Sequence, residues 1–359
     1  MFGPEAAGPR TLSGRYDREG RLGTVADIDW TRIVTAATRA PSIHNTQPWR
    51  FVARPDRLDV FYDRERALPV LDPSGRQQVI SCGIAAAFAV VALRADGAAA
   101  ATDLLPDPGD QDHLARIAVT GPYEPTDSDR ALAAAIEQRH TVRAAFEPRA
   151  VPAELLDRLQ REAGGYGLWM KVVDREEEET ATVFLLSQAE ELEQGDPAYL
   201  KELESWMRTD PGAVDGVPVE AVPEGDPRDR PSNWLVRDFV VGTREPQGMF
   251  RSGGDPDAPP PEVERPTVLL LGTESDDRAA WLQAGQALGQ LLLVATASGL
   301  VASPLTQALD WPAARTRLRQ RLSLVGYPQM LLRMGYPATG LTPPVTGRRP
   351  VAEVLSTEG

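Results

Sequence analysis

The chain has 359 residues, a formal net charge of −14 and 42% hydrophobic residues. Its length suits about two domain-sized units with a sizeable core, and its negative charge argues against non-specific binding of nucleic acid or of an anionic membrane surface. We see no apolar run that approaches the roughly 20 residues of a membrane span. Residues 1–23 lack an apolar signal core, and we interpret them as a loose N-terminal arm.

The elements of the first part follow from apolar periodicity and from helix and turn signals. They are, in order, a helix capped by Thr24 or Asp27 and ending at Arg39, a hairpin over 49–53 and 58–62, a buried helix over 74–96 closed by Gly97, a strand near 114–119 and a helix that begins at Thr126–Asp127. The first helix ends where it does because the residue before Pro41 is pushed out of the helical region.

The same order of elements restarts after residue 150. A helix over 152–163 precedes a strand over 168–173, and a long apolar helix over 281–298 is closed by Gly299. Two short segments of the first part also have similar sequences in the second: Trp49–Val52 resembles Trp169–Val172, and Ala95–Gly97 resembles Ala297–Gly299. We interpret the chain as a divergent duplication, with a first half over 24–125 and a second half over 126–359.

The second half carries an insertion at about 190–265 that is rich in Pro, Gly and acidic residues. Long non-repetitive loops in compact proteins are usually functional covers or disordered spacers. The insertion contains Trp206, Met207 and Trp234 among other apolar residues, which favours a packed cover.

Cysteine and histidine usage limits the chemistry further. Cys82 is the single cysteine, so an internal disulfide is excluded, which fits a reducing cytosol. Its apolar neighbours predict a buried thiol rather than a nucleophile. His44, His113 and His140 lie far apart without paired ligand spacing, so we expect no metal site. We expect a cytoplasmic protein.

A polar loop, residues 41–47, connects the first helix to the first strand. Small polar side chains at fixed positions after a helix can meet the polar edge of a flat ligand. Alternatively, they satisfy their own backbone in an ordinary helix-to-strand connection.

Three segments together resemble the nitroreductase (FMN-dependent flavin reductase) superfamily, especially its Acg-like branch. They are Ala40–Phe51, then Arg139–Phe146, and finally Leu332–Pro337 followed by Gly347–Val351. The resemblance implies an α+β, nitroreductase-like fold that forms an internal pseudo-dimer of two central-sheet and helix halves. It also implies that the insertion is a lid over a flavin.

The resemblance also implies which residues bind FMN and which take part in catalysis. Arg139, Arg348 and Arg349 would bind the phosphate, with Thr141 adding a hydroxyl, and Arg143 would stabilise charge near N1 and C2=O of the ring. The other half would supply Pro41, Ser42, Asn45 and Gln47 to the ribityl chain and ring edge. Ser303, Pro304 and Thr306 would lie beside the ring, with Thr306 near N5, and His44 would donate a proton to substrate.

Each of these assignments has a plainer alternative. Arg348 and Arg349 read as a solvated pair of charges near the chain end, and Arg143 as an ordinary surface arginine. His44 can simply hold the loop together. Trp49, at a strand start, is expected in the core rather than as a stacking platform.

Two functions compete. The first is an oxidoreductase that transfers hydride through flavin N5 between NAD(P)H or an organic substrate and a small organic acceptor. The second is a flavin store whose closed lid allows little turnover; a scaffold without cofactor is a third. The second half has Ala163–Gly167 where the first has its polar loop, so we expect one FMN per chain. An internal pseudo-dimer is expected to be a monomer or a weak homodimer.

Overall fold

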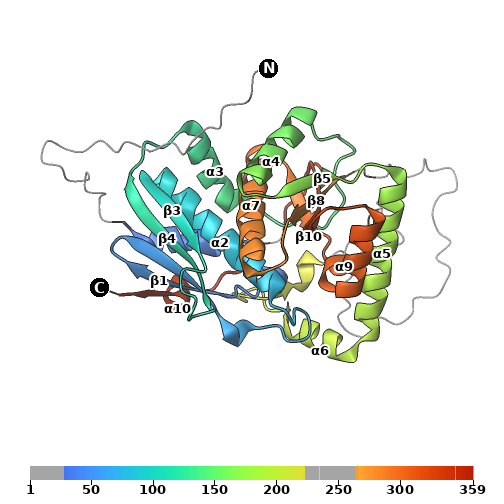
Figure 1. The fold of residues 1–359 in the computed structure, drawn as a ribbon, viewed down its shortest axis with the longest axis horizontal. Helices are drawn as coiled ribbons and strands as arrows, with labels where there is room; N and C mark the ends of the chain where they lie inside the picture. Colours follow the sequence, from blue (N-terminus) through green and yellow to red (C-terminus); the bar gives the residue numbers. More distant parts are fainter. Residues whose placement is uncertain (1–27, 223–233, 235–263, 265, 344, 359) are drawn as a thin grey trace, which may run out of the picture.

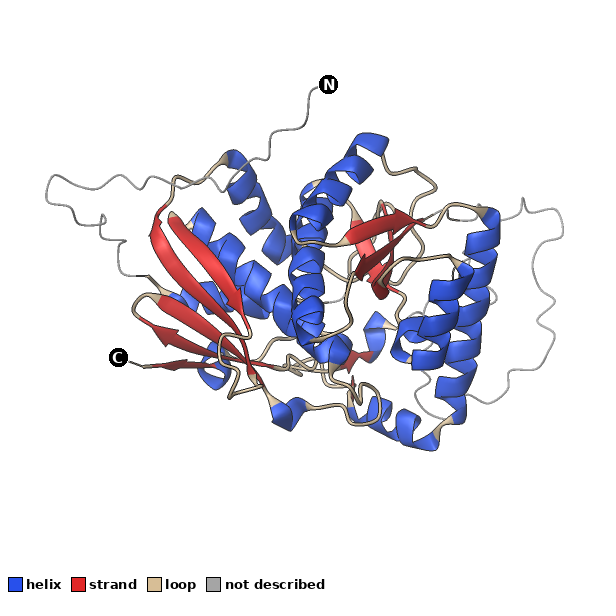
Figure 2. Cartoon of the chain, viewed as in Figure 1, coloured by secondary structure: helices blue, strands red, loops and turns tan. Residues whose placement is uncertain are grey.

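The computed structural model describes residues 28–222, 234, 264, 266–343 and 345–358. The expected arm over 1–23 and most of 223–265 lie outside the described residues. The chain contains both helices and strands. Two sheets lie on either side of a central pair of helices (Figures 1 and 2). The expected α+β fold is confirmed.

The described helices and strands cover both halves of the chain. The helices are α1 (Trp30–Thr38), α2 (Arg76–Ala95), α3 (Asp127–Gln138), α4 (Ala153–Gly165), α5 (Glu176–Gly195), α6 (Pro197–Ser205), α7 (Arg278–Ala297), α8 (Gln307–Asp310), α9 (Pro312–Arg321) and α10 (Val351–Val354). The strands are β1 (Trp49–Arg54), β2 (Arg57–Tyr62), β3 (Ala98–Leu104), β4 (His113–Pro122), β5 (Trp169–Val172), β6 (Met207–Arg208), β7 (Val217–Pro218), β8 (Thr267–Thr273), β9 (Val301–Pro304), β10 (Tyr327–Gly335) and β11 (Leu355–Thr357).

The first helix is shorter than the sequence predicts. It begins at Trp30, and its N-cap is Asp29, whose carboxylate accepts a hydrogen bond from Arg32 N at 3.1 Å. This corrects the expected caps, which lie among residues outside the described part of the chain. The helix after Thr126 begins as predicted, with a capping box formed by Thr126 and Asp129.

The two main sheets have the same strand order. The first sheet runs β11-β1-β2-β4-β3 and the second runs β5-β8-β10-β9. Apart from β11, each sheet has four strands, and a 20-residue helix lies between the second and the third strand along the chain. In each sheet the third strand forms an edge and the last strand lies next to it in the interior. All neighbouring strands in these four-stranded sets are antiparallel.

The end of the chain returns to the first half. β11 pairs in parallel with β1, so that Phe51 lies opposite Leu355. The expected boundary gave all residues after 125 to the second half, and the last of these residues reach across to the sheet of the first half. The last residues complete the sheet of the first half, because the outer edge of β1 offers unpaired backbone groups that β11 satisfies.

The core of the molecule lies around α2 and α7. Both helices end at a glycine in the left-handed region, Gly97 with φ 86° and Gly299 with φ 79°, as the sequence predicts. α2 has the length and apolar composition of a membrane span, contrary to the expectation, but 83% of that stretch is buried inside the protein. Its apolar side chains therefore pack against protein.

The two central helices touch through their backbones at one pair of glycines. A Cβ atom on Gly83 would lie 2.5 Å from Leu282 O, and one on Gly285 would lie 2.1 Å from Ile80 O. Neither carbonyl oxygen can move without disturbing its helix, so any side chain here would push the helices apart.

We expect Gly285→Ala to destabilise the protein, because the added methyl group meets a backbone oxygen. The expected cost is about 1–3 kcal/mol in the free energy of unfolding, seen as a lower melting temperature. Gly164→Ala in α4 is the matched control: its Cβ meets nothing within 4 Å, and alanine in a helix stabilises by up to about 1 kcal/mol relative to glycine. Equal melting temperatures for the two variants would contradict the close backbone contact between α2 and α7.

Candidate functional site

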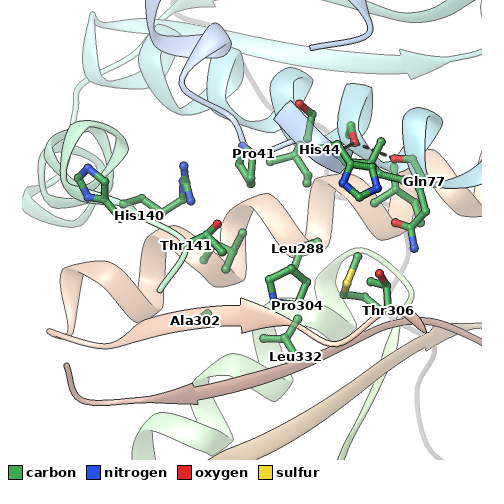
Figure 3. Close-up of a pocket in the computed structure, with 18 of the residues that line it drawn as sticks. Pro41, His44, Gln77, His140, Thr141, Leu288, Ala302, Pro304, Thr306 and Leu332 are labelled. Carbon is green, nitrogen blue, oxygen red and sulfur yellow. Dashed lines mark hydrogen bonds between the residues drawn. The ribbon is translucent and has the colours of Figure 1, made fainter. Parts of the chain in front are cut away.

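A cavity lies between the two halves of the chain (Figure 3), and the empty space in it, with open solvent at its mouth included, is about 950 Å³. We call it the main cavity. Its lining comes from the loop after α1, from both central helices, from the segment after α3 and from β9 and β10. A side cavity of about 530 Å³ adjoins it and shares part of its lining, namely Pro41, Ser42, His44, Arg139, His140, Thr141 and Arg143.

The walls of the main cavity are largely apolar. α2 contributes Ile80 and Ile84, α7 contributes Leu288 and Leu292, and β10 contributes Met330 and Leu332. Because α2 and α7 belong to different halves, each half supplies part of the apolar surface. Such a surface suits a flat aromatic group.

The polar loop that opens the first half is folded tightly beside this cavity. Its backbone places three residues other than glycine in the left-handed region, His44 with φ 45°, Asn45 with φ 54° and Gln47 with φ 50°. Ser42 Oγ accepts a hydrogen bond from Gln47 N at 2.9 Å, and Ser81 Oγ accepts one from Ile43 N at 3.2 Å. Strain of this kind persists only when surrounding contacts hold it.

The loop divides its polar side chains between two directions. Pro41, Ser42 and His44 line the main cavity. Asn45 borders only the side cavity, and its Nδ2 donates to Gly216 O at 3.0 Å and to Gly347 O at 3.2 Å. Gln47 is fully buried and lines neither cavity.

The side-chain amide of Gln47 is occupied by two backbone groups. Its Nε2 donates to Val214 O at 2.8 Å, and its Oε1 accepts from Arg349 N at 2.9 Å. The expectation that Gln47 contacts a cofactor is therefore corrected: the turn at this residue points it away from the cavity, and its donor and acceptor are used by the protein.

The segment after α3 forms the opposite wall. Thr141 bridges in parallel to Ala302 on β9, and Val142 N donates to Ala302 O at 3.1 Å. This pairing presents Arg139, Thr141 and Arg143 along the cavity. The structure thus brings together the two distant segments that the sequence singles out.

Arginines gather at one end of this site. Arg139 Nη2 and Arg348 Nη2 both approach the carbonyl oxygen of Arg39, at 3.4 Å and 3.3 Å. The Nε atoms of Arg139 and Arg348 are buried and have no hydrogen-bond partner among the described residues. Within the same part of the chain neither side chain forms an ion pair, whereas Arg39 pairs with Glu137 at 3.0 Å.

Burial is the main influence on the charges of these two arginines. Burial, followed by the nearby charge of Arg39, lowers the pKa of Arg139 to about 10. Burial, together with the charges of Arg139 and Arg39, lowers the pKa of Arg348 to about 9. Both directions mean that the charged form is held at a cost, which a bound anion would offset.

Arg349 and Ser303 lie elsewhere, which corrects two expectations. Arg349 pairs with Asp63 at 3.2 Å and lines neither cavity. On β9, Ala302 and Pro304 line the main cavity but Ser303 does not, because successive side chains of a strand point to opposite faces. Thr306, at the start of α8, lines the cavity as expected.

Three polar lining residues were missed by the sequence analysis, Gln77, Ser81 and His140. Gln77 Nε2 donates to Asp310 Oδ1 at 2.7 Å, which fixes the orientation of its amide. The available signal was the polar start of an otherwise apolar helix, Arg76–Gln78. His140 has no comparable signal beyond its place between two predicted site residues.

Part of the expected lid is described and packs beside the site. We call residues 196–222, which comprise α6, β6, β7 and the turn Val219–Ala221, the cover segment. It borders the side cavity through Gly216, Val217 and Ala221, and Ala221 O accepts from Arg143 Nη1 at 3.3 Å.

Charged contacts hold the cover segment on the first half. Asp215 forms an ion pair with Arg66 and another with Arg208, the second at 2.8 Å. Glu202 accepts hydrogen bonds from Val70 N at 3.1 Å and Leu71 N at 2.6 Å. A small apolar cluster also joins the segment to the first half, since Leu68 and Leu71 pack in it with Tyr199, Leu203, Val217 and Ala221.

Other candidate chemistry is not supported by the described residues. Within them, no group of three His, Cys, Asp or Glu side chains is arranged to hold a metal ion. Cys82 is buried, its Sγ lies 3.2 Å from Pro48 O, and burial raises the pKa of its thiol. A thiol with a raised pKa is a poor nucleophile at neutral pH.

Comparison with known proteins gives a consistent family. No family model matches the chain. Two proteins of Mycobacterium tuberculosis H37Rv are similar to it: "Putative NAD(P)H nitroreductase Rv3131" is 37% identical over 90% of both chains, and "Putative NAD(P)H nitroreductase acg" is 32% identical over 90% of this chain and 93% of acg. "Probable NAD(P)H nitroreductase PigM" of Serratia is 26% identical over 90% and 92%.

Solved structures give more distant matches. A BluB-like flavoprotein from Clostridium difficile 630 has a TM-score of 0.40 at 13% identity, covering 63% of this chain and 97% of its own. The FMN-dependent nitroreductase NfnB from Mycobacterium smegmatis, in complex with NADPH, has a TM-score of 0.32 at 18% identity, covering 62% and 96%. Because relatives above 30% identity span nine-tenths of this chain, it belongs to the nitroreductase family, in the branch that includes acg.

Proposed function

We propose that this protein binds FMN and is an oxidoreductase of nitroreductase type. It would transfer hydride through flavin N5 between NAD(P)H or an organic substrate and a small organic acceptor. One observation carries the proposal: the loop Pro41–His44 and the segment Arg139–Arg143, about 100 residues apart in sequence, line one cavity. Family membership supports the same reading, because the relatives are named NAD(P)H nitroreductases.

The residues present fit FMN at both of its ends. The phosphate needs fixed cationic donors, and Arg139 and Arg348 offer buried Nε atoms without a partner among the described residues. A guanidinium is a planar, permanently charged donor that matches phosphate oxygens. Thr141, which lines both cavities, adds a hydroxyl donor. The apolar surface of α2, α7 and β10 suits the ring.

The protein's own groups would orient the cofactor and stabilise charge. Bound FMN would supply the hydride chemistry at its N5 atom. The guanidinium of Arg143 would stabilise the negative charge that arrives with the hydride, because a fixed cation in a water-poor site acts strongly. Thr306 would hold the ring near N5 and His44 would deliver a proton to substrate, each from its place on the cavity lining.

We also propose one FMN per chain, in a protein that is an internal pseudo-dimer. The identical strand order of the two sheets supports a duplication. At the position equivalent to the polar loop, the second half has the end of α4 with Gly164 and Gly165, which offer no polar side chains. A chain with both halves built in needs no second copy, so we propose a monomer or weak homodimer that acts on small molecules in the cytoplasm.

The cover segment favours a second candidate function, flavin storage with little turnover. Asn45 and Gln47 both bind backbone oxygens of this segment, at Gly216 and Val214. Arg66 adds an ion pair to Asp215. A segment held this firmly would limit access of NAD(P)H to the ring.

Replacing Arg348 should weaken FMN binding far more than replacing its neighbour. Arg348→Ala removes a charged donor at the phosphate end, and we expect a loss of affinity of about 10–100-fold, which corresponds to a charged hydrogen bond of about 1.5–3 kcal/mol. Arg349→Ala is the matched control, since its side chain binds Asp63 outside the cavity, and we expect a change below about threefold by the same scale.

Flavin fluorescence titration of the apoprotein would measure both affinities. Inorganic phosphate should raise the melting temperature of the apoprotein, and Arg348→Ala should remove that gain, because a ligand stabilises only the state that binds it. Equal losses of affinity for the two variants would overturn the assignment of the phosphate end.

Weakening the contacts of the cover segment should distinguish an oxidoreductase from a flavin-storage protein. Asp215→Asn weakens the ion pairs to Arg66 and Arg208, and if the cover limits access, anaerobic NADPH should bleach the bound flavin at least about tenfold faster than in the wild type, which needs only about 1.4 kcal/mol. Asp210→Asn is the control, because Asp210 accepts a hydrogen bond from Gly212 N within its own turn.

The wild type itself decides between the two functions in stopped-flow absorbance. Rapid bleaching supports turnover, and bleaching that appears only in Asp215→Asn supports storage. A protein that refuses added FMN contradicts both.

A further inference from the structure

Arg333 lies in the middle of the second sheet, on the face that points away from the cavity. β10 runs between β8 and β9, and Met330 and Leu332 on this strand line the main cavity. Strand alternation places Arg333 on the other face from Leu332. Its side chain is 1% exposed, so it is one of the deepest charges in the protein.

The guanidinium of Arg333 contacts the segment that carries Arg143. Its Nη2 donates to Arg143 O at 2.7 Å and to Ala144 O at 2.8 Å, while its Nη1 forms an ion pair with Glu264. Glu264 in turn accepts from Phe146 N at 2.5 Å. The backbone of residues 143–146 is thus held by contacts on the face of the sheet opposite the cavity.

Neighbouring residues of β10 complete this fastening. The Arg333 guanidinium carbon lies 4.3 Å from the centre of the Phe146 ring. Gly335 leaves room for that ring, since a Cβ there would lie 2.7 Å from Phe146 Cδ2. Glu147 N donates to Tyr336 O at 2.9 Å. The first two contacts account for the arginine and the glycine of Arg333–Gly335.

We propose that Arg333 is a positioning residue that sets where the Arg143 side chain lies against the bound flavin. This inference rests on the proposed function. The backbone of Arg143 is held on one side by Val142 N to Ala302 O, 3.1 Å, and on the other by Arg333. A cation stabilises developing charge only if its position is fixed before the reaction.

The alternative is that Arg333 stabilises the fold without influencing the site. A buried ion pair is weak evidence for stability, because desolvation offsets much of the attraction. The specific contacts favour positioning: two of the Arg333 contacts are to consecutive carbonyls of the segment, and its carboxylate partner accepts from Phe146 N two residues further along.

The test compares Arg333→Lys with Arg315→Lys. Lysine keeps the charge beside Glu264 but cannot hold two carbonyls with a planar fork. Arg315 is the matched control, since it also joins a β10 carbonyl, Pro328 O at 2.7 Å, to a carboxylate, Asp276 at 2.7 Å, and contacts nothing between residues 139 and 147.

Hydrogen exchange of the apoprotein is the first readout. We expect amides of residues 142–147 to exchange at least about tenfold faster in Arg333→Lys and to be unchanged in Arg315→Lys. The midpoint potential of bound FMN is the second. We expect Arg333→Lys to weaken binding of reduced relative to oxidised FMN about tenfold, equal to a fall of about 30 mV for a two-electron couple, in the same direction as Arg143→Ala.

Each outcome decides one of the two claims. Equal exchange in both lysine variants, or faster exchange with an unchanged potential, overturns the positioning role. A wild type that binds no FMN overturns the proposed function, while the exchange data still decide whether Arg333 fastens the segment. If Arg333→Lys does not fold, the double variant Arg333→Met with Glu264→Gln removes both charges together and should show the same faster exchange.

Discussion

The backbone contact between α2 and α7 is the constraint on which the rest of the structure depends. Gly83 and Gly285 let the two longest apolar helices approach until one helix meets the carbonyl oxygens of the other. That approach joins the two halves into one continuous core, which contains residues of both sheets. It also sets the width of the cavity, because Ile84 and Leu288 on the same helices form part of the wall. The site is therefore a product of how the halves are joined.

At the arginine end, the described part of the chain leaves two buried guanidinium groups, those of Arg139 and Arg348, without an ion pair. Elsewhere the described buried arginines have acceptors: Arg76 binds Asp310 and two backbone oxygens, and Arg333 binds Glu264 and two carbonyls. Among the described residues, Arg139 and Arg348 share the Arg39 carbonyl as an acceptor, and Arg348 also donates to Thr346 and to Gly347 O. In a chain with net charge −14, carboxylates are plentiful. Within the described residues Glu137 is the carboxylate at this end, and it pairs with Arg39 rather than with Arg139 or Arg348.

Much of the fold could be predicted from the sequence, and the reasons are local. Gly97, Gly299 and the Thr126 cap mark helix ends by backbone chemistry that holds in any fold. The destination of the last residues could not be predicted in this way, because the pairing of β11 with β1 depends on a contact across about 300 residues of chain. Short strands carry too little periodicity to reveal a distant partner.

The same contrast applies to the site. Residue type identified the two segments that meet, but it could not tell which side chains face the cavity. Ser303 is turned away by strand alternation, and Gln47 by a turn with positive φ. Only three-dimensional contacts decide such directions.

The polar loop shows why residue type alone was insufficient. Asn45 and Gln47 have the amides that a flavin edge would need, yet both bind backbone groups of the cover segment and of the chain around Arg349. An amide carries a donor and an acceptor at once, so it can join three backbone segments as readily as it can bind a ligand. These contacts also hold the loop in its left-handed turns, which present Ser42 and His44 to the cavity. One set of hydrogen bonds thus holds both the cover segment and the loop, so a change that displaces the cover segment would also relax the loop.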